Sequence, residues 1–189
     1  MATITTNDLK NGMSLSLDDG LFQVVEFQHV KPGKGGAFVR TTLKNVRNGA
    51  VVDRTFRAGE KVERAIIDKR EMQFLYREGD DYVFMDNQSY EQIEVAADMI
   101  GDDKNFLLDN LECDVLFYNE RPVGVSLPSH VVYEVTECEP GVKGDTATGA
   151  SKQATISTGY TLQVPLFIKV GERIKVDTRT GDYLERVNL

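Results

Sequence analysis

The sequence has few of the residues that mark disulfide frameworks, metal sites and membrane spans. Its 189 residues include two cysteines, two histidines and no tryptophan, with no CxxC or HxxxH pair. No window approaches the roughly 18 to 20 consecutive apolar residues that a membrane helix requires, and "MATITTNDLK" at the start lacks the apolar core of a signal peptide. We therefore expect a folded cytoplasmic protein without a zinc site, a disulfide framework or a membrane segment.

The scarce cysteines and histidines are expected to be structural. Cys113 alternates with Val115 and Phe117 in "LECDVLFY", which predicts a thiol in the core, with a disulfide or a catalytic thiolate as the alternatives. His29 and His130 lie in strand patterns and have no serine, cysteine or carboxylate at a suggestive spacing. The acidic stretch "GDDKNF" lacks the ligand spacing of a calcium loop. We expect no catalytic residue, no metal and no bound cofactor.

Charge is distributed unevenly along a chain whose net charge is −8. Residues 1–64 carry ten Lys or Arg against seven Asp or Glu, residues 65–127 five against fifteen, and residues 128–189 seven against eight. All basic residues of the first third except one lie between Lys31 and Arg64. One basic region on an acidic protein suits a phosphate-rich partner. An ordinary solvated strand face explains the same pattern.

Apolar and polar residues alternate with period two, which predicts an all-β protein. Turn signals divide the strands into three small β-barrel domains, over residues 1–64, 65–127 and 128–189. One helical patch is expected from about Val95 to Leu108. Units of about 60 residues bury little surface on their own, so we expect them to pack end to end in an elongated molecule.

Two turns and one strand have specific signals. Asn48 and Gly49 form a two-residue hairpin signal, and a second hairpin is expected to turn near Thr180-Gly181. Alternating apolar residues from Leu162 to Val170 predict one strand with a single buried face. Pro165 within it indicates a sheet edge or a bulge, because proline has no amide hydrogen for the ladder.

The stretch "KPGKGGAF" places Lys34 among three glycines and a proline. Gly33, Gly35 and Gly36 permit left-handed backbone angles and remove side chains, while Pro32 stiffens one leg of the hairpin. The pattern predicts a single cation on a slim projection that fits a crowded anionic cleft. A solvated turn and a Schiff-base lysine are the alternatives, and the second usually needs a buried amine.

Neither glycine-rich stretch is a nucleotide-hydrolysis loop. A P-loop requires Ser or Thr directly after the lysine and then a helix, whereas glycines and a strand pattern follow Lys34. The second stretch, "GVKGDTATGAS", offers backbone amides, hydroxyls and Asp145. A loop of this composition suits contact with nucleotide edges or phosphates, and mere flexibility is the alternative.

"KPGKGGAF", "GDTATGAS" and the closing "VPLFIKVGERIKVDTRTGDYLERV" together strongly resemble the bacterial translation elongation factor P family, in the same order and over essentially the whole chain. The resemblance implies an SH3-like or KOW-like N-terminal barrel followed by two OB-like barrels, in an L-shaped arrangement that is similar to tRNA. It further implies a monomer that is not an enzyme.

The resemblance also implies a function and a set of partners. Such a protein binds the 70S ribosome between the peptidyl and exit tRNA sites, contacts ribosomal RNA and peptidyl-tRNA, and stimulates peptide-bond formation at consecutive prolines. Lys34 matches the tip residue that reaches toward the CCA end of peptidyl-tRNA. Gly144, Asp145 and Thr146 match the loop that approaches the exit-site mRNA codon.

Four further residues are expected to contact RNA. Tyr183 and Arg186, in "GDYLERV", match the region near the tRNA elbow, and Lys31 and Arg40 are inferred as phosphate contacts from their position and charge. The family attaches a β-lysyl or aminopentanol-type group to a tip lysine through a modifying enzyme. "GKGG" does not choose between these groups and leaves an unmodified Lys34 open.

Two other functions compete with translation. A general RNA or single-strand binding module would use the OB-like barrels and leave the Lys34 loop incidental. An enzyme that uses Lys34 covalently would form an adduct with a carbonyl substrate that borohydride traps.

Overall fold

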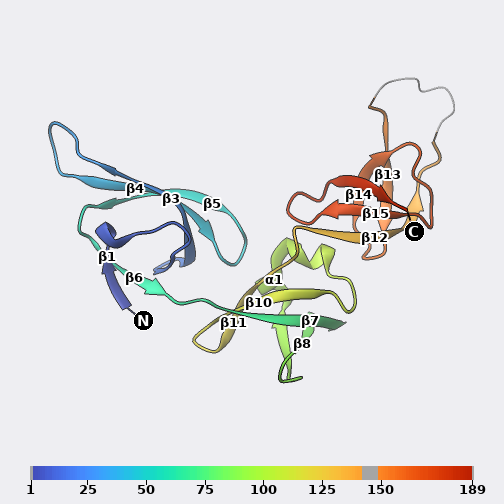
Figure 1. The fold of residues 1–189 in the computed structure, drawn as a ribbon, viewed down its shortest axis with the longest axis horizontal. Coiled ribbons are helices and arrows are strands. Elements are labelled where there is room, and N and C mark those ends of the chain that lie inside the picture. The colour runs from blue at the N-terminus through green and yellow to red at the C-terminus, as the bar shows by residue number, and fades with distance from the viewer. Residues whose placement is uncertain (1, 142–148, 189) are drawn as a thin grey trace. The chain divides into compact units, whose positions relative to one another are not determined.

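The computed structural model describes residues 2–141 and 149–188 and is almost entirely β-structure (Figure 1). Its strands form three antiparallel sheets, and the sheets follow one another along the chain. The predicted helical patch is confirmed as a short helix α1 (Ala97–Ile100) followed by a 3-10 helix η2 (Gly101–Phe106), and Gly101 has a φ of +65° where one passes into the other. None of the helices in the described ranges is long and apolar enough to span a membrane.

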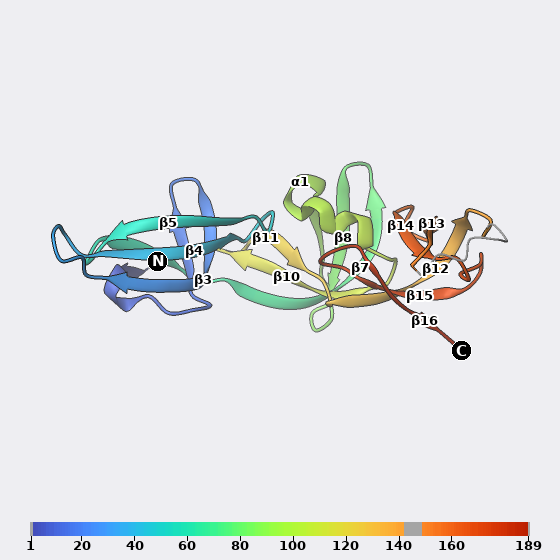
Figure 2. The ribbon, with the colours of Figure 1, turned by 90° about the horizontal axis from the view of Figure 1, so that it is seen from above.

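The first sheet has the strand order β1-β6-β2-β3-β4-β5. Its long central pair is β3 with β4, and Figure 2 shows β5 beside them. A short 3-10 helix, η1 (Thr6–Asp8), follows the first strand. Its six strands are β1 (Ala2–Thr5), β2 (Ser14–Leu17), β3 (Gly20–Val30), β4 (Phe38–Asn45), β5 (Val51–Arg57) and β6 (Lys61–Ala65).

The second and third sheets have five strands each. The second has the order β11-β10-β7-β8-β9 and the third the order β14-β13-β12-β15-β16. Their strands are β7 (Asp68–Glu78), β8 (Asp81–Asp86), β9 (Gln92–Ala96), β10 (Glu112–Tyr118), β11 (Arg121–Ser126), β12 (His130–Cys138), β13 (Ser151–Ile156), β14 (Thr161–Pro165), β15 (Arg173–Asp177) and β16 (Tyr183–Val187).

Contacts divide the chain into two compact units. The first comprises Met1–Arg70, Asp98–Gly101 and Val115–Val125, and the second comprises the remaining segments, Glu71–Ala97, Asp102–Asp114 and Ser126–Leu189. Each unit has its own buried cluster. The expected three-part division and the L-shaped arrangement stay predictions.

Alternation explains the two buried clusters, because every second side chain of a strand faces the same side. The first cluster consists of Leu9, Leu15, Phe22, Val24, Val39, Leu43, Phe56 and Val62. The second gathers Phe106 with side chains of the last sheet, namely Tyr133, Val135, Ala154, Ile156, Leu162, Val164, Ile168, Ile174 and Val176.

Two local predictions were wrong in detail. The Asn48-Gly49 signal does mark a hairpin, but Asn45 N donates to Ala50 O at 2.8 Å, so four residues rather than two form the turn. The apolar alternation from Leu162 does not continue to Val170, because β14 ends at Pro165 and Val170 is 59 % exposed. Pro165 lies on an edge strand, as predicted, since β14 is the outermost strand of its sheet.

Candidate nucleic-acid interface

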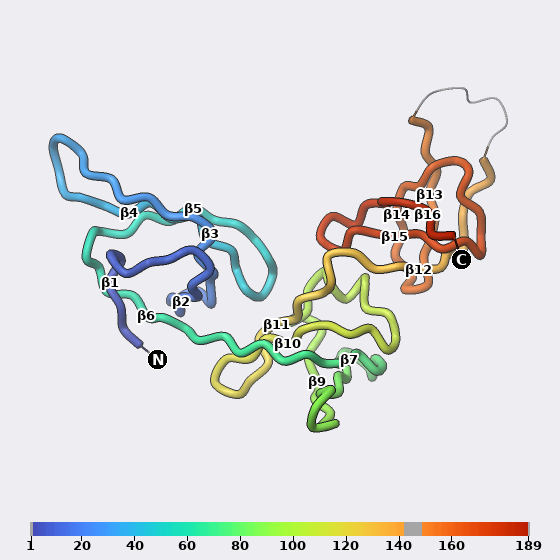
Figure 3. Tube along the Cα trace, in the orientation of Figure 1, coloured from blue at the N-terminus to red at the C-terminus, as the bar shows by residue number. Residues whose placement is uncertain are grey.

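The β3–β4 hairpin carries Lys34 beyond the end of the sheet. The two strands pair up to Val30 and Phe38, and the neighbouring segment closes with a hydrogen bond from Ala58 N to Ala37 O at 3.1 Å. Residues 31–36 lie past these last bonds, and all six are exposed. In Figures 1 and 3 this connection is the blue tip that extends past β5. The hairpin therefore presents Lys34 directly to solvent.

The glycines of this tip leave its backbone uncovered by side chains, as the sequence predicts. Gly35 has a φ of +107°, in the left-handed region that favours glycine. A Cβ atom added at Gly35 would meet only Pro32 Cγ, at 4.0 Å, and among the described residues nothing lies within 4 Å of one added at Gly33 or Gly36. Within the same part of the chain, Lys34 has neither a hydrogen bond nor an ion pair. A large molecule can thus approach the amine without displacing protein groups.

Two arginines lie on the same face of β4 and of its neighbour β5. Arg40 on β4 lies opposite Thr55, and Arg57 on β5 lies opposite Phe38, so both guanidinium groups project from the same side of the sheet. The Arg40 guanidinium carbon lies 5.9 Å from the centre of the Phe38 ring. Lys31 is exposed at the start of the connection. Sequence reasoning missed Arg57, which only the strand register brings beside Arg40.

Two other arginines of this region form ion pairs within the protein. Arg54 donates to both carboxylate oxygens of Asp19, at 3.0 and 2.7 Å, and lies over the Phe22 ring. Its hydrogen bonds lower the pKa of the Asp19 carboxyl. Arg47 pairs with Asp98 at 3.2 Å. The cations offered to a partner are consequently fewer than the charge count of the sequence suggests.

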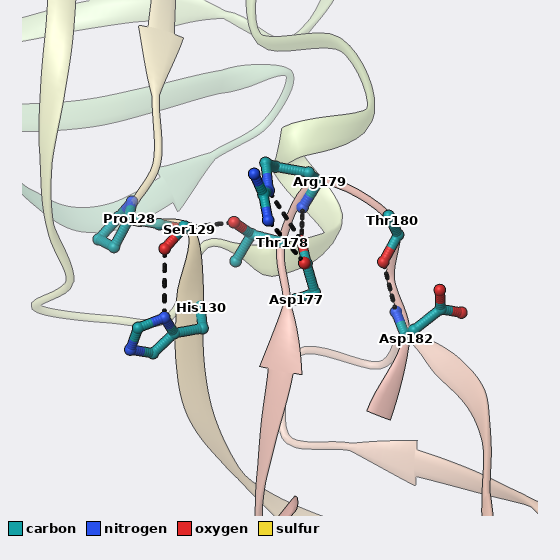
Figure 4. A network of polar contacts seen from close by, with 8 residues as sticks. All are labelled: Pro128, Ser129, His130, Asp177, Thr178, Arg179, Thr180 and Asp182. Carbon is teal, nitrogen blue, oxygen red and sulfur yellow. Dashed lines mark hydrogen bonds and ion pairs between the residues drawn. The ribbon is translucent and has the colours of Figure 1, made fainter. Parts of the chain in front are cut away.

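In the third sheet, a polar network holds the connection between β15 and β16 (Figure 4). Thr178 donates its amide to Ser129 O at 3.1 Å and its hydroxyl to Pro128 O. Arg179 donates to the Asp177 carboxylate from its amide at 2.8 Å and from its guanidinium at 3.0 Å. These bonds lower the pKa of Asp177. The network fixes the backbone immediately before Tyr183.

The two predicted contacts on β16 already have partners within the protein. Tyr183 is half-buried against the second cluster, and its burial raises the pKa of the phenol. Arg186 pairs with Glu172 at 3.4 Å, and its guanidinium carbon lies 5.3 Å from the centre of the Phe167 ring. Gly144, Asp145 and Thr146 lie outside the described residues. The RNA-binding roles of these five residues stay predictions.

The described residues offer little for catalysis. They contain no group of three potential metal-ligating side chains. Cys113 is buried, as predicted. Desolvation and, to a smaller extent, nearby carboxylates raise the pKa of its thiol to about 12, so the thiol stays protonated and is not a reactive thiolate. His29 packs edge-on against Phe27, and His130 Nδ1 lies 3.2 Å from Ser129 Oγ. The arrangement as a whole fits binding through exposed cations.

Comparisons with known proteins cover nearly the whole chain. Three family models match in order: the elongation factor P KOW-like domain over residues 5–62, its OB domain over residues 67–125, and its C-terminal domain over residues 131–186. The all-β fold with KOW-like and OB-like barrels is thereby confirmed.

Curated relatives agree with the family models. The elongation factor P of Salinispora arenicola is 62 % identical over 182 residues, covering 96 % of this chain and 98 % of the relative. Those of Kocuria rhizophila and Picosynechococcus are each 56 % identical, over 97 % of this chain and 98 % and 99 % of the relatives.

Solved structures of another translation factor share part of the fold. A eukaryotic translation initiation factor 5A from Methanococcus jannaschii aligns with a TM-score of 0.50 at 27 % identity, over 67 % of this chain and 92 % of that one. A protein of the same factor family from Naegleria fowleri aligns at a TM-score of 0.54 and 14 % identity, over 66 % of this chain and 95 % of its own, and shows likeness of fold.

Proposed function

Because the chain belongs to the elongation factor P family of translation factors, we propose that it binds the 70S ribosome in the cytoplasm, between the peptidyl and exit tRNA sites, and stimulates peptide-bond formation at consecutive prolines. The observation that carries this proposal is the exposed Lys34 amine on a tip where the neighbouring residues 33, 35 and 36 are glycines. A tip of this shape fits a narrow RNA-lined cleft.

The proposed action is positioning. Proline is a poor nucleophile held in a ring, and a misplaced donor ester loses much of the rate that correct orientation supplies, since a shift of about 1 Å can cost on the order of a hundredfold. The Lys34 cation would hold the CCA end of peptidyl-tRNA through its phosphates. The ribosome performs the chemistry, so the protein itself is not an enzyme.

The outer face of the hairpin would anchor this contact. Lys31, Arg40 and Arg57 lie on or beside the strands that carry Lys34. Side chains diagonally opposed across two strands are about 7 to 8 Å apart, a spacing that suits neighbouring phosphates. Arginine also offers several donors to phosphate oxygens at once. We therefore include Arg57 among the RNA contacts.

The remaining contacts are carried over from the family. Gly144, Asp145 and Thr146 would approach the exit-site codon, and Tyr183 and Arg186 the elbow region of tRNA. For Arg186 the contact would have to be made while the guanidinium also pairs with Glu172, or in exchange for that pair. Both side chains of this pair are partly exposed, and such pairs contribute little to stability, so either arrangement costs little.

The Lys34 amine is also open to covalent extension. Its exposure and lack of a partner within the described residues give a modifying enzyme free access. A β-lysyl or aminopentanol-type group would lengthen the reach of the tip. An intact-mass measurement on protein from the native host, followed by peptide mapping around Lys34, tests this point, and an unchanged mass means that the bare amine acts.

Replacement of Lys34 tests the proposed function. Lys34→Ala should leave the fold intact, because the side chain is exposed and makes no hydrogen bond or ion pair with the described residues, yet it should abolish the stimulation of proline-run synthesis in a purified translation system. Lys10→Ala removes another exposed cation of the same barrel, outside the hairpin, and serves as the matched control. Full stimulation by Lys34→Ala would refute the proposal and favour a general RNA-binding module.

A further inference from the structure

A glycine within β11 marks a close approach between backbone segments. Gly124 is buried in the interior of the strand, and its φ lies outside the left-handed region, so this glycine provides space rather than backbone freedom. A Cβ atom added at Gly124 would lie 3.3 Å from Val46 O and 3.9 Å from Met99 O. Val46 follows β4 and Met99 belongs to α1, so three segments that are distant in the sequence meet at this glycine.

Hydrogen bonds hold the same place together. Val46 N donates to Leu21 O at 2.9 Å, which fixes the turn after β4 to its own sheet. Arg47, the next residue, donates from Nε to Asp98 O and from Nη2 to Asp98 Oδ2, both at 3.2 Å. The contact formed by Val46, Arg47, Asp98 and Gly124 is a joint that lies within the first compact unit.

The joint and Lys34 lie at opposite ends of β4 (Figure 1). This strand has eight residues, with the tip connection before it and the turn of Val46 after it. At about 3.3 Å per residue, β4 is about 26 Å long. It pairs with β3 on one side and with β5 on the other, which makes it a stiff element. A tilt of the sheet at the joint is therefore multiplied along β4 and reaches its largest displacement at the tip.

We propose that Gly124 and the Arg47–Asp98 pair are positioning residues, which set the direction in which the β3–β4 hairpin holds the Lys34 amine. The inference rests on the proposed function, in which Lys34 holds the CCA end of peptidyl-tRNA. The close approach at Gly124 sets the distance between the joined segments. The Arg47 hydrogen bonds limit rotation about that contact. Both act on Lys34 through β4.

The size of the effect follows from the length of β4. A methyl group at Gly124 forces Val46 O away by a few tenths of an ångström. With a neighbouring strand about 4.8 Å away as the pivot, a displacement of about 0.3 Å corresponds to a tilt of about 4° and moves the far end of β4 by about 1.6 Å. A misplacement of about 1 Å can cost on the order of a hundredfold in rate. One methyl group at the joint is therefore enough to misdirect Lys34.

Residual dipolar couplings of the full chain measure this tilt, because they report the direction of each amide N–H bond in a common frame. The amides of β3 and β4 are compared with those of residues 115–125. Gly124→Ala should rotate the first group relative to the second by about 4°, and Gly124→Val by a larger angle. Couplings within each group should stay mutually consistent, because each sheet keeps its own pairing. A loss of stability alone would leave the relative direction unchanged.

Activity in the purified translation system is the second measurement. Gly124→Ala should lower the stimulation of proline-run synthesis at least about tenfold. Arg47→Ala should lower it as well, and exchange of the two charges, Arg47→Asp with Asp98→Arg, should recover part of the loss.

Two matched controls should keep both the sheet direction and the stimulation. Arg77→Ala removes an arginine whose side chain is 58 % exposed, against 55 % for Arg47, and which pairs with Asp80 in its own hairpin. Gly171→Ala strains the backbone in the other compact unit, where nothing among the described residues lies within 4 Å of an added Cβ. It therefore costs stability without touching the joint.

Two outcomes would overturn the inference. The first is an unchanged direction of β3 and β4 in Gly124→Ala, which also decides the matter if Gly124→Val does not fold. The second is full stimulation by Gly124→Ala together with a measured tilt. Failure of the proposed function is distinguishable, because Lys34→Ala then stimulates fully while Gly124→Ala still tilts the sheet. That result would remove the role of the joint in translation and keep its control of the sheet direction.

Discussion

A methyl group added at Gly181 should destabilise the last barrel more than one added at a comparable glycine. Gly181 has a φ of +80° and ends the turn between β15 and β16. A Cβ atom at this position would overlap Tyr160 Oη and would lie 3.0 Å from Tyr160 Cζ and 3.4 Å from Phe106 Cζ. Gly181→Ala therefore forces either the turn or the Tyr160 ring to move.

The expected cost has two parts. Alanine in the left-handed region costs about 1 to 2 kcal/mol. Displacing the Tyr160 ring disrupts its pair with Phe106, whose ring centres are 4.8 Å apart, and such a pair contributes about 0.5 to 1.5 kcal/mol. The sum is about 1.5 to 3.5 kcal/mol.

Gly171→Ala is the matched control for the backbone part. Gly171 has a φ of +88°, and nothing among the described residues lies within 4 Å of an added Cβ. The control should thus cost only about 1 to 2 kcal/mol. Urea unfolding followed through NMR signals of the last barrel should place the midpoint of Gly181→Ala below that of Gly171→Ala by about 0.5 M, given a slope of about 2 kcal/mol per molar.

A second variant tests whether the overlap with Tyr160 causes the loss of stability in Gly181→Ala. Tyr160→Phe removes the oxygen that the new methyl group would overlap, so it should recover part of the loss in the Gly181→Ala background. Equal midpoints for the two glycine variants, or no recovery with Tyr160→Phe, would refute the reasoning.

Two more predictions concern titratable groups. Burial raises the pKa of Cys113 to about 12. Iodoacetamide should therefore label the half-buried Cys138 first in the folded protein, and Cys113 only upon unfolding. Mass spectrometry can follow both labelling rates, and equal rates would contradict this prediction. Hydrogen bonds from Arg179 lower the pKa of Asp177 below its usual 3.8, so this carboxylate stabilises the fold above that pH and loses its contribution as the pH falls through the folded value. Asp177→Asn should then show a smaller drop in urea midpoint between neutral pH and about pH 3, and an unchanged drop would refute the assignment.

The tip hairpin could be predicted because its signals are local. Proline and glycine restrict or free the backbone residue by residue, so "KPGKGGAF" implied a slim turn before any partner strand was known. The predicted turn near Thr180-Gly181 is confirmed for the same reason. The length of the turn after Asn45 was not predicted correctly, because hydrogen bonds of the Asn45 side chain and backbone extend this turn to four residues.

By itself, the sequence determined the all-β class, the exposed Lys34 and, through three separated motifs, the family. Tertiary structure alone decided which cations remain available: the register placed Arg57 beside Arg40, while pairing used Arg54 and Arg47 for the fold. It also brings Gln163 and Asp182, which are distant in the sequence, into the lining of the same hollow. The alternation of apolar and polar residues and the residues that form turns depend on neighbours along the chain. Ion pairs and concave surfaces depend on residues that only folding brings together.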